Sequence, residues 1–304
     1  MALEGIHHVT AITADAPANV EFYVGVLGLR LIKKTVNFDA PEVYHLYYGD
    51  EQASAGAAMT FFEFPGTPRG VAGAGMVHTV AWRVGSPAAL DFWAERFDSL
   101  EIAATRTGEV LRFADPEGMA LELHAVAVSD PPLVGVSSQI PAEHALQGFH
   151  LIRAYSSEPG RSAGVLEALA MTPLGDDVWE SRGSQRGGTL HYDPPPAGVL
   201  AQQGGGSVHH VAWSAADDEE LAELRAAVMA AGAAPTPIID RQYFHSVYFR
   251  EPSGVLFELA TRDVGFDIDE PLETLGEALL LPPQHEHMRA RLEKTLTPLP
   301  SPGR

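Results

Sequence analysis

The sequence predicts an α+β fold made of four related modules, each a strand followed by a helix and further strands. Four segments rich in β-branched and apolar residues open alike around a histidine, and each is typical of a strand. The histidines follow one another at steps of 71, 72 and 59 positions, which suits one compact unit each. The four segments are Gly5–Thr10, Met76–Ala81, Gly148–Arg153 and Ser207–Ala212.

A helical pattern follows the first strand of each module. In module one Asp15 can cap a helix whose first turn accepts Pro17, and Gly28 is expected to end it. Comparable helical stretches are Pro87–Phe97, Gly160–Ala170 and Asp217–Ala231. The apolar stripe of the first helix is predicted to be Val20, Tyr23, Val24 and Leu27.

Two modules close with strands joined by matching Pro-containing turns. The turns are Asp115–Gly118 and Glu251–Gly254, where glycine supplies a positive φ. We expect two double-module domains, separated by a Pro- and Ser-containing link over residues 128–141. Residues 1–130 would hold modules one and two, residues 145–270 modules three and four, and residues 271–304 an extension with a short helix.

Composition excludes several classes of function. The formal net charge of −20 argues against a nucleic-acid partner and disfavours binding to an anionic membrane. No apolar run is long enough to span a bilayer and the N-terminal residues do not resemble a signal peptide, so a soluble, cytoplasmic protein is expected. Lys33 and Lys34 are expected to be solvated. Because there are no cysteines, a transition-metal site must use the 13 histidines and the carboxylates.

Comparing the four module openings separates the histidines into two groups. The second position is His8 in module one and His210 in module four, but Thr79 and Leu151 in the other two. Since strand neighbours alternate in direction, His8 and His210 are expected to share one face, and the preceding histidines to start from the other. His8 and His210 are therefore candidate metal ligands, although hydrogen-bonded strand histidines are the alternative. The first position is histidine throughout: His7, His78, His150 and His209.

The carboxylate candidate is Glu258, which lies in an apolar strand where an ionised group needs a partner or a metal. Module one offers Glu63 as a candidate fourth ligand, module two has Glu122 and module three has His191. Only modules one and four supply a complete set, so modules two and three are expected to form a degenerate counterpart. Two histidines and one carboxylate suit non-haem Fe(II).

The module pattern resembles the vicinal oxygen chelate (glyoxalase/bleomycin-resistance) superfamily, whose βαβββ units pair into half-barrels around a metal. More narrowly, the chain is similar to ring-cleaving dioxygenases that act on hydroquinones, and this similarity runs from residue 5 to about residue 284. It rests on the strings Gly5–Thr10, Phe22–Leu31, Lys33–Phe38, Tyr44–Asp50 and Asp240–Pro252.

This resemblance implies Fe(II)-dependent, extradiol-type cleavage of hydroquinone-like or catechol-like aromatics by O2, with Mn(II) as an alternative metal. The family's ligands fall on His8, His210 and Glu258. The implied catalytic positions around them are His7, Thr10, His209, Arg241 and Tyr248. The protein could also form a homo-oligomer. Glu63 and His245 depart from the family's usual residues.

The roles of two residues have structural alternatives. Tyr248 or His209 could donate a hydrogen bond to charge that develops on oxygen, but Tyr248 could equally be a half-buried strand aromatic. Arg241 could anchor a phenolate or position Tyr248, or it could form a surface ion pair with Asp240 or Glu251.

Two other functions remain open at this level. A glyoxalase-like isomerase or lyase would use His8, Glu63, His210 and Glu258 as four ligands of a redox-inert metal. A non-catalytic protein that sequesters ligands would keep the fold without the chemistry.

Overall fold

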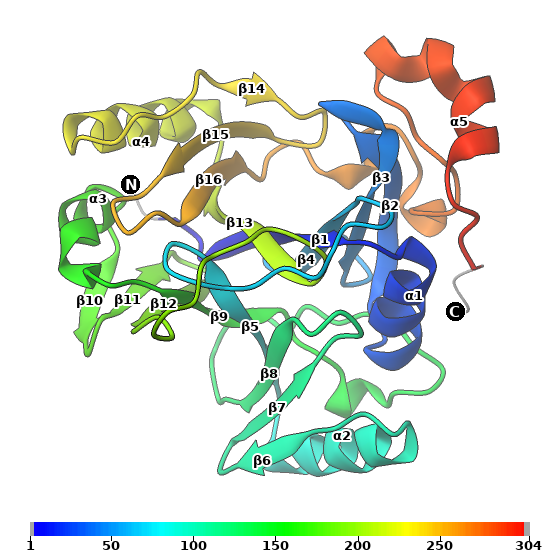
Figure 1. Ribbon diagram of the computed structural model, residues 1–304, viewed down its shortest axis with the longest axis horizontal. Helices are drawn as coiled ribbons and strands as arrows, with labels where there is room; N and C mark the ends of the chain where they lie inside the picture. The colour runs from blue at the N-terminus through cyan, green and yellow to red at the C-terminus, as the bar shows by residue number, and fades with distance from the viewer. Residues whose placement is uncertain (1–2, 301–304) are drawn as a thin grey trace.

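The computed structural model describes residues 3–300, which form two eight-stranded sheets (Figure 1). The first sheet has the strand order β14-β15-β16-β13-β1-β4-β3-β2 and joins modules one and four. Its strands are β1 (Ile6–Thr13), β2 (Arg30–Asn37), β3 (Ala40–Gly49), β4 (Ala58–Glu63), β13 (Ser207–Ala215), β14 (Ile239–Asp240), β15 (His245–Arg250) and β16 (Leu256–Thr261).

The second sheet joins modules two and three in the order β10-β11-β12-β9-β5-β8-β7-β6. The α+β fold of four paired modules is therefore confirmed. The strands of this sheet are β5 (Val77–Val84), β6 (Thr105–Thr107), β7 (Val110–Ala114), β8 (Ala120–Ala125), β9 (Phe149–Tyr155), β10 (Thr172–Gly175), β11 (Val178–Arg182) and β12 (Gly187–Asp193).

The helices lie where the sequence predicts them, with one difference in winding. The Asp15 side chain accepts a hydrogen bond from the Ala18 amide and caps α1, and Gly28 has a φ of +70° where the chain turns into β2. After α1 the chain continues as a π-helix over Glu21–Val26, which leaves Val24 only half-buried. The α-helices are α1 (Ala16–Val20), α2 (Pro87–Ser99), α3 (Ala163–Ala168), α4 (Asp218–Ala230) and α5 (Arg289–Thr295).

Each sheet takes two modules from opposite halves of the chain. Each sheet therefore contains strands from both expected domains, residues 1–130 and residues 145–270. The division of the chain into domains at these bounds stays a prediction. The extension after residue 270 contains the expected short helix, α5, whose Leu292 is buried. Residues 301–304, at the end of the expected extension, lie outside the described residues.

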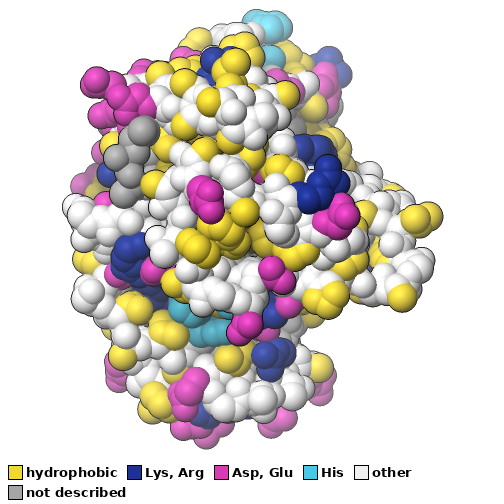
Figure 2. All heavy atoms as spheres, turned by 90° about the vertical axis from the view of Figure 1, so that its left-hand side faces the viewer, with side chains coloured by type: hydrophobic (Ala, Val, Ile, Leu, Met, Phe, Trp, Pro, Cys, Tyr) yellow, Lys and Arg dark blue, Asp and Glu magenta, His cyan; other side chains and the backbone are white. Residues whose placement is uncertain are grey.

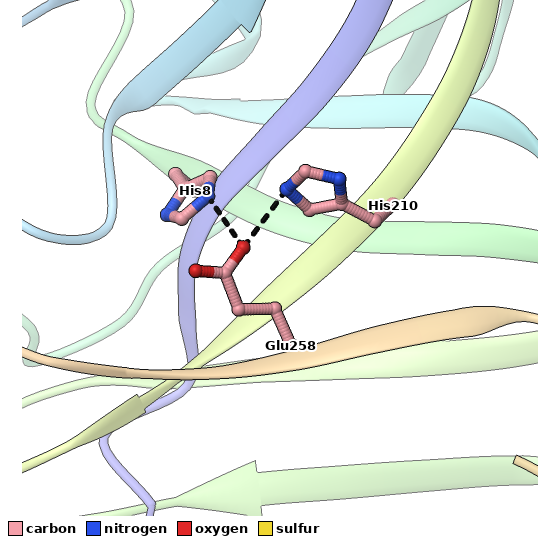
Figure 3. A group of neighbouring side chains, drawn as sticks. All are labelled: His8, His210 and Glu258. Carbon is pink, nitrogen blue, oxygen red and sulfur yellow. Dashed lines mark ion pairs between the residues drawn. The ribbon is translucent and has the colours of Figure 1, made fainter. Parts of the chain in front are cut away.

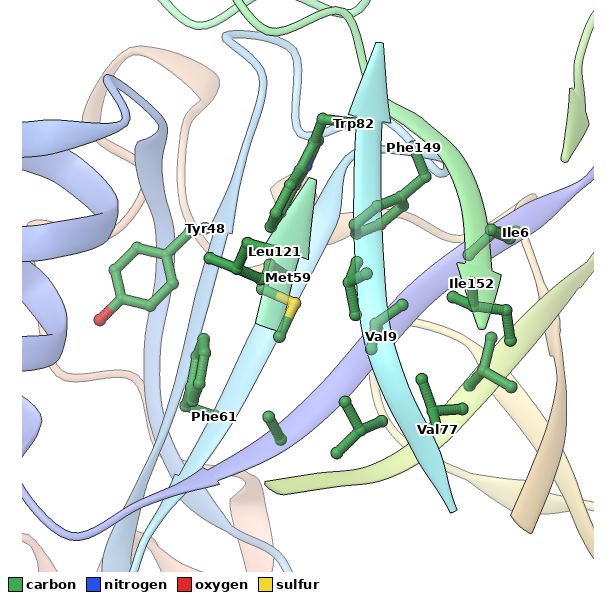
Figure 4. Packing of buried hydrophobic residues seen from close by; sticks show 14 of the residues in the cluster. Ile6, Val9, Tyr48, Met59, Phe61, Val77, Trp82, Leu121, Phe149 and Ile152 are labelled. Carbon is green, nitrogen blue, oxygen red and sulfur yellow. The ribbon is translucent and has the colours of Figure 1, made fainter. Parts of the chain in front are cut away.

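The hydrophobic core lies between the two sheets. Every residue of β1 is buried, and in Figure 4 Ile6 and Val9 of β1 lie beside Val77 of β5 and Ile152 of β9. Trp82 on β5 is fully buried next to Phe149. Burial of such side chains stabilises the fold by about 1.5–3 kcal/mol each, so β1 is held rigidly along its length.

Asp115 links modules one and two and makes the stability of the fold depend on pH. Its Oδ1 accepts hydrogen bonds from the amides of Glu117 and Met119, and its Oδ2 accepts one from the Tyr23 hydroxyl at 3.3 Å. Burial raises the pKa of Asp115 to about 6. Since the folded-state pKa exceeds the unfolded one, this carboxyl favours folding below about pH 4, and that contribution is lost as the pH rises through about 6.

We expect the Asp115→Asn variant not to lose this stability as the pH rises, because the amide keeps an acceptor oxygen but carries no charge. The difference in free energy of unfolding between the variant and the wild type should grow in favour of the variant from pH 4 to pH 7. Because the pKa of Asp115 is raised by about two units, this difference in the free energy of unfolding should be at most about 3 kcal/mol. Urea denaturation at pH 4, 5, 6 and 7 measures it, and parallel curves for the two proteins would contradict the role of Asp115.

Candidate metal centre

His8, His210 and Glu258 come together in the first sheet, as the sequence predicts (Figure 3). They lie on the neighbouring strands β1, β13 and β16, and all three are buried. Glu258 Oε2 is 3.1 Å from His8 Nε2 and 2.9 Å from His210 Nε2. In the described part of the chain this is the one group of three such side chains whose ligand atoms lie within 4.8 Å of one another.

A pair of β-bulges places the preceding histidines beside these ligands. Between β1 and β13, His7 is skipped in the pairing on one strand and His209 on the other. A bulge interrupts the alternation of side chains. The expectation that His7 and His209 start from the opposite face is therefore wrong, since each approaches its neighbour's ring. His78 and His150 are skipped in the same way in the second sheet, so the recurring first histidine marks a bulge in every module.

His7 fixes the protonation of His8. Its Nε2 lies 3.1 Å from the carbonyl oxygen of Thr261, which can only accept, so the proton of His7 is on Nε2. Burial lowers the pKa of His7 to about 3, which keeps the ring neutral and leaves its Nδ1 as an acceptor. His8 Nδ1 lies 2.9 Å from that atom and must donate to it. His8 therefore turns its Nε2 toward Glu258, with its Nδ1 proton held by His7.

The electrostatics of the site centre on the buried carboxylate of Glu258. His210 Nε2 and Glu258 Oε2 are buried, and their 2.9 Å contact does not have the geometry of a hydrogen bond. Burial lowers the pKa of His210 despite the nearby carboxylate. Burial opposes ionisation of Glu258, but the facing imidazoles outweigh it and hold its pKa well below the usual range. Two imidazole nitrogens and a carboxylate oxygen that converge in this way fit a divalent cation.

The second oxygen of Glu258 is held by two hydroxyl groups. Ser246 Oγ donates to Glu258 Oε1 at 2.5 Å, and the Tyr248 hydroxyl donates to the same atom at 3.0 Å. Arg241 Nε donates to the Tyr248 oxygen at 3.3 Å. Sequence reasoning missed Ser246, although its position two residues before Tyr248 on β15 places both side chains on one face.

We expect Ser246→Ala to weaken metal binding by about 10–100-fold, because the carboxylate loses a partner that orients it. Titration of the metal-free protein with Fe(II) or Mn(II) under nitrogen measures the affinity. Ser246→Thr, which keeps the hydroxyl, is the matched control. Equal affinities in all three proteins would show that Ser246 does not orient Glu258.

The candidate metal centre opens into a cavity of about 430 Å³ with aromatic walls. Thr10, His209, Arg241 and Tyr248 line it together with the three candidate ligands, whereas His7 stands behind His8. Arg241 forms its ion pair with Asp39, at 3.1 Å, and with neither Asp240 nor Glu251. The apolar walls are formed by Phe38, Phe62, Phe64, Ile239, Phe244 and Leu256. The catalytic roles of the lining residues stay predictions.

Glu63 does not lie in this site, so the expectation of a fourth ligand is wrong. Its Oε1 accepts hydrogen bonds from the Ala16 amide and from Thr297 in the C-terminal extension. In β4 the residue that faces Thr10 is Thr60. His245, the other departure from the family, forms ion pairs with Asp218 and Asp240 near the surface.

The second sheet has the expected degenerate counterpart. Glu122 pairs with Ala81, at the position that corresponds to Glu258 opposite Ala212. Its carboxylate is bound by Arg112 at 2.9 Å and by His124 at 2.7 Å, so its charge is satisfied without a metal.

The surface agrees with the charge balance. On the face shown in Figure 2, Lys and Arg side chains stand singly or in small groups beside Asp and Glu and form no extended basic area. Among the described helices, none has the length and apolarity that a membrane crossing requires.

Comparison with known proteins places the chain in a superfamily. The family model described as Glyoxalase/Bleomycin resistance protein/Dioxygenase superfamily matches residues 5–123 and 148–259, and the chain belongs to this superfamily. Within it, the chain is 38% identical to MhqO of Bacillus subtilis, which is named as a ring-cleaving dioxygenase, over 97% of this chain and 96% of that protein. It is 31% identical to the chlorohydroquinone/hydroquinone 1,2-dioxygenase of Sphingobium indicum, over 97% and 96%.

Solved structures give the same result. A crystal structure of a Bacillus subtilis protein described as a dioxygenase superposes with a TM-score of 0.91 at 36% identity, covering 98% of each chain. Glyoxalase I from Zea mays superposes with a TM-score of 0.61 at 16% identity, over 85% of this chain and 92% of that one, which shows a shared fold.

Proposed function

We propose that this protein is an Fe(II)-dependent, extradiol-type dioxygenase that opens hydroquinone-like aromatic rings with O2. One observation carries the proposal: two imidazoles and one carboxylate turn their ligand atoms toward one another, within 4.8 Å, beside an aromatic-walled cavity. This donor set is typical of non-haem Fe(II) oxygenases. The names of the relatives support the reaction and the substrate class.

The chain's own residues would bind and orient the substrate. When bound, Fe(II) supplies open coordination positions and the redox chemistry that joins an aromatic diol to O2. Phe38 and Phe62 on the pocket walls exclude water and can contact the ring. Burial raises the pKa of Tyr248, so its hydroxyl stays protonated and keeps donating its hydrogen bond to Glu258. Arg241 gives the pocket a fixed positive charge that attracts a phenolate.

The alternatives receive less support. A four-ligand isomerase needs Glu63, which lies elsewhere, and a binding protein without chemistry does not need a buried cluster of two histidines and a carboxylate. Mn(II) as the metal, catechol-like substrates, a cytoplasmic location and a homo-oligomeric state stay predictions.

The test starts with protein purified without oxygen. We expect iron in the purified protein, and O2 consumption coupled to a change in ultraviolet absorbance when hydroquinones are added. Substrate conversion without O2 consumption would favour the isomerase. Tight binding of an unchanged aromatic by metal-free protein would favour the binding protein.

A further inference from the structure

A hydrogen-bonded chain of four side chains runs along the pocket wall, and the mechanism above does not use it. Thr10 Oγ1 lies 2.8 Å from Thr60 Oγ1, which lies 2.9 Å from His45 Nε2. His45 Nδ1 lies 2.8 Å from the Tyr47 hydroxyl. Thr10, His45 and Tyr47 line the cavity, and Thr60 is fully buried behind them. Both ends of the chain therefore reach the pocket.

Strand pairing fixes this chain in place. Thr60 on β4 is the partner of Thr10 on β1 and of Tyr47 on β3. His45 lies two residues before Tyr47, so both side chains project from the same face of β3. Because the three strands are interior members of the sheet, the four groups are held at hydrogen-bond distance by the backbone and need no ligand to assemble them.

The chemistry of the four groups permits two arrangements of the protons. Burial lowers the pKa of His45 well below its usual value, so the ring is neutral, with one N–H and one acceptor nitrogen. In the first arrangement Tyr47 donates to His45, His45 to Thr60 and Thr60 to Thr10, and the Thr10 proton is free to face the pocket. In the second arrangement Thr10 donates to Thr60, Thr60 to His45 and His45 to Tyr47. The Tyr47 proton is then free to face the pocket.

We infer that His45 is the central positioning residue of a proton relay between the two ends of the pocket. The inference rests on the proposed function, because the proton comes from a ring hydroxyl beside Thr10. Starting from the second arrangement, that O–H bond breaks and its proton goes to Thr10. Thr10 passes its own proton to Thr60, and Thr60 passes its proton to His45 Nε2. His45 then releases the proton on Nδ1 to Tyr47, and Tyr47 passes its own proton to a water molecule.

Each relay group gains one proton and loses one, so only the tautomer of His45 and the direction of the hydrogen bonds change. The relay therefore allows a buried ring hydroxyl to lose its proton without placing a charge on the pocket wall. A positioned proton-transfer group typically accelerates a reaction by about 10²–10⁴-fold.

The test is a matched pair at Thr60, which contacts neither the ligands nor the cavity. Thr60→Val keeps the shape of the side chain and breaks the chain, whereas Thr60→Ser keeps the hydroxyl. We expect Thr60→Val to lower kcat for hydroquinone by about 100-fold with little change in KM, and Thr60→Ser to stay near the wild type. Tyr47→Phe, which removes one end, should resemble Thr60→Val. Equal kcat in Thr60→Val and the wild type would overturn the relay.

A second measurement does not depend on turnover. In the protein loaded with diamagnetic Zn(II), ¹⁵N NMR of labelled histidine reports the tautomer of His45. We expect Thr60→Val to change the tautomer ratio and Thr60→Ser to preserve it. An unchanged tautomer ratio of His45 in Thr60→Val would show that the hydrogen-bonded chain does not exist, whatever the activity of the variant. A wild type that consumes no O2 with any hydroquinone would instead overturn the proposed function, and the NMR result would still decide whether the chain exists.

Discussion

Glu258→Gln is expected to abolish iron binding and ring cleavage. Two neutral imidazoles leave Glu258 as the only negative charge in the ligand set. The amide removes that charge and turns one ligand oxygen into an N–H group, which cannot bind a metal. We expect a loss well beyond the 10–100-fold that is typical of changes outside the ligand set. Iron content after anaerobic purification and O2 uptake with hydroquinone measure it.

Glu122→Gln is the matched control for this substitution. Glu122 occupies the equivalent strand position in module two, is also buried, and is bound by Arg112 and His124. The control should therefore retain iron and activity, even if it loses some stability. Stoichiometric iron together with turnover in Glu258→Gln would refute the ligand set. Thermal unfolding of the metal-free proteins shows whether either variant is misfolded.

The sequence predicts the fold and the ligands because both are encoded by repetition. Each module carries the same strand opening, so a histidine that is present in two modules and absent from two stands out as a candidate ligand. His8 and His210 meet that condition. Glu258 adds a carboxylate in an otherwise apolar strand, which is costly without a partner. These signals lie in local patterns and need no knowledge of packing.

The errors arise where long-range pairing decides the outcome. Glu63 belongs to the right strand but lies three residues beyond Thr60, which takes the position facing Thr10. Strand register depends on partners that a single strand does not show. The bulges at His7 and His209 likewise require two strands to be compared.

Hydrogen-bonded hydroxyls are the least visible part of the site. Ser246 and Thr60 are ordinary strand residues in the sequence, and only their partners give them a role. His45 belongs to a string that supports the family resemblance, but nothing in the string distinguishes its ring from that of a structural histidine.

Lys33 also departs from expectation, because its side chain is fully buried. Its Nζ lies 2.8 Å from Asp269 Oδ1, 3.1 Å from Glu270 Oε2, and 5.0 Å from the centre of the Tyr243 ring. The other oxygen of Asp269 accepts hydrogen bonds from Gln242 and Tyr243. Through Asp269, Lys33 joins β2 to the segment that carries Arg241 into the pocket.

Lys33→Met is expected to lower the free energy of unfolding by about 3–5 kcal/mol, because it leaves two acidic groups, one of them buried, without their cation. Chemical denaturation measures this, and Lys34→Met is the control. Lys34 is only half-buried and donates to the Glu277 carbonyl, so its replacement should cost less than about 1 kcal/mol. A loss below about 1 kcal/mol in Lys33→Met would contradict the role of the buried cation.

A combined variant separates the buried charge from the lost contact. In Lys33→Met with Asp269→Asn and Glu270→Gln, no carboxylate of this group remains unpaired, so most of the stability should return. The two amides do not restore the native arrangement, however, because the contact between β2 and the Arg241 segment is still missing. We therefore expect both Lys33→Met and the combined variant to have a higher KM for hydroquinone than the wild type, although the stability of the combined variant recovers. If the free energy of unfolding and the KM for hydroquinone both returned to the wild-type values, Lys33 would act on stability alone.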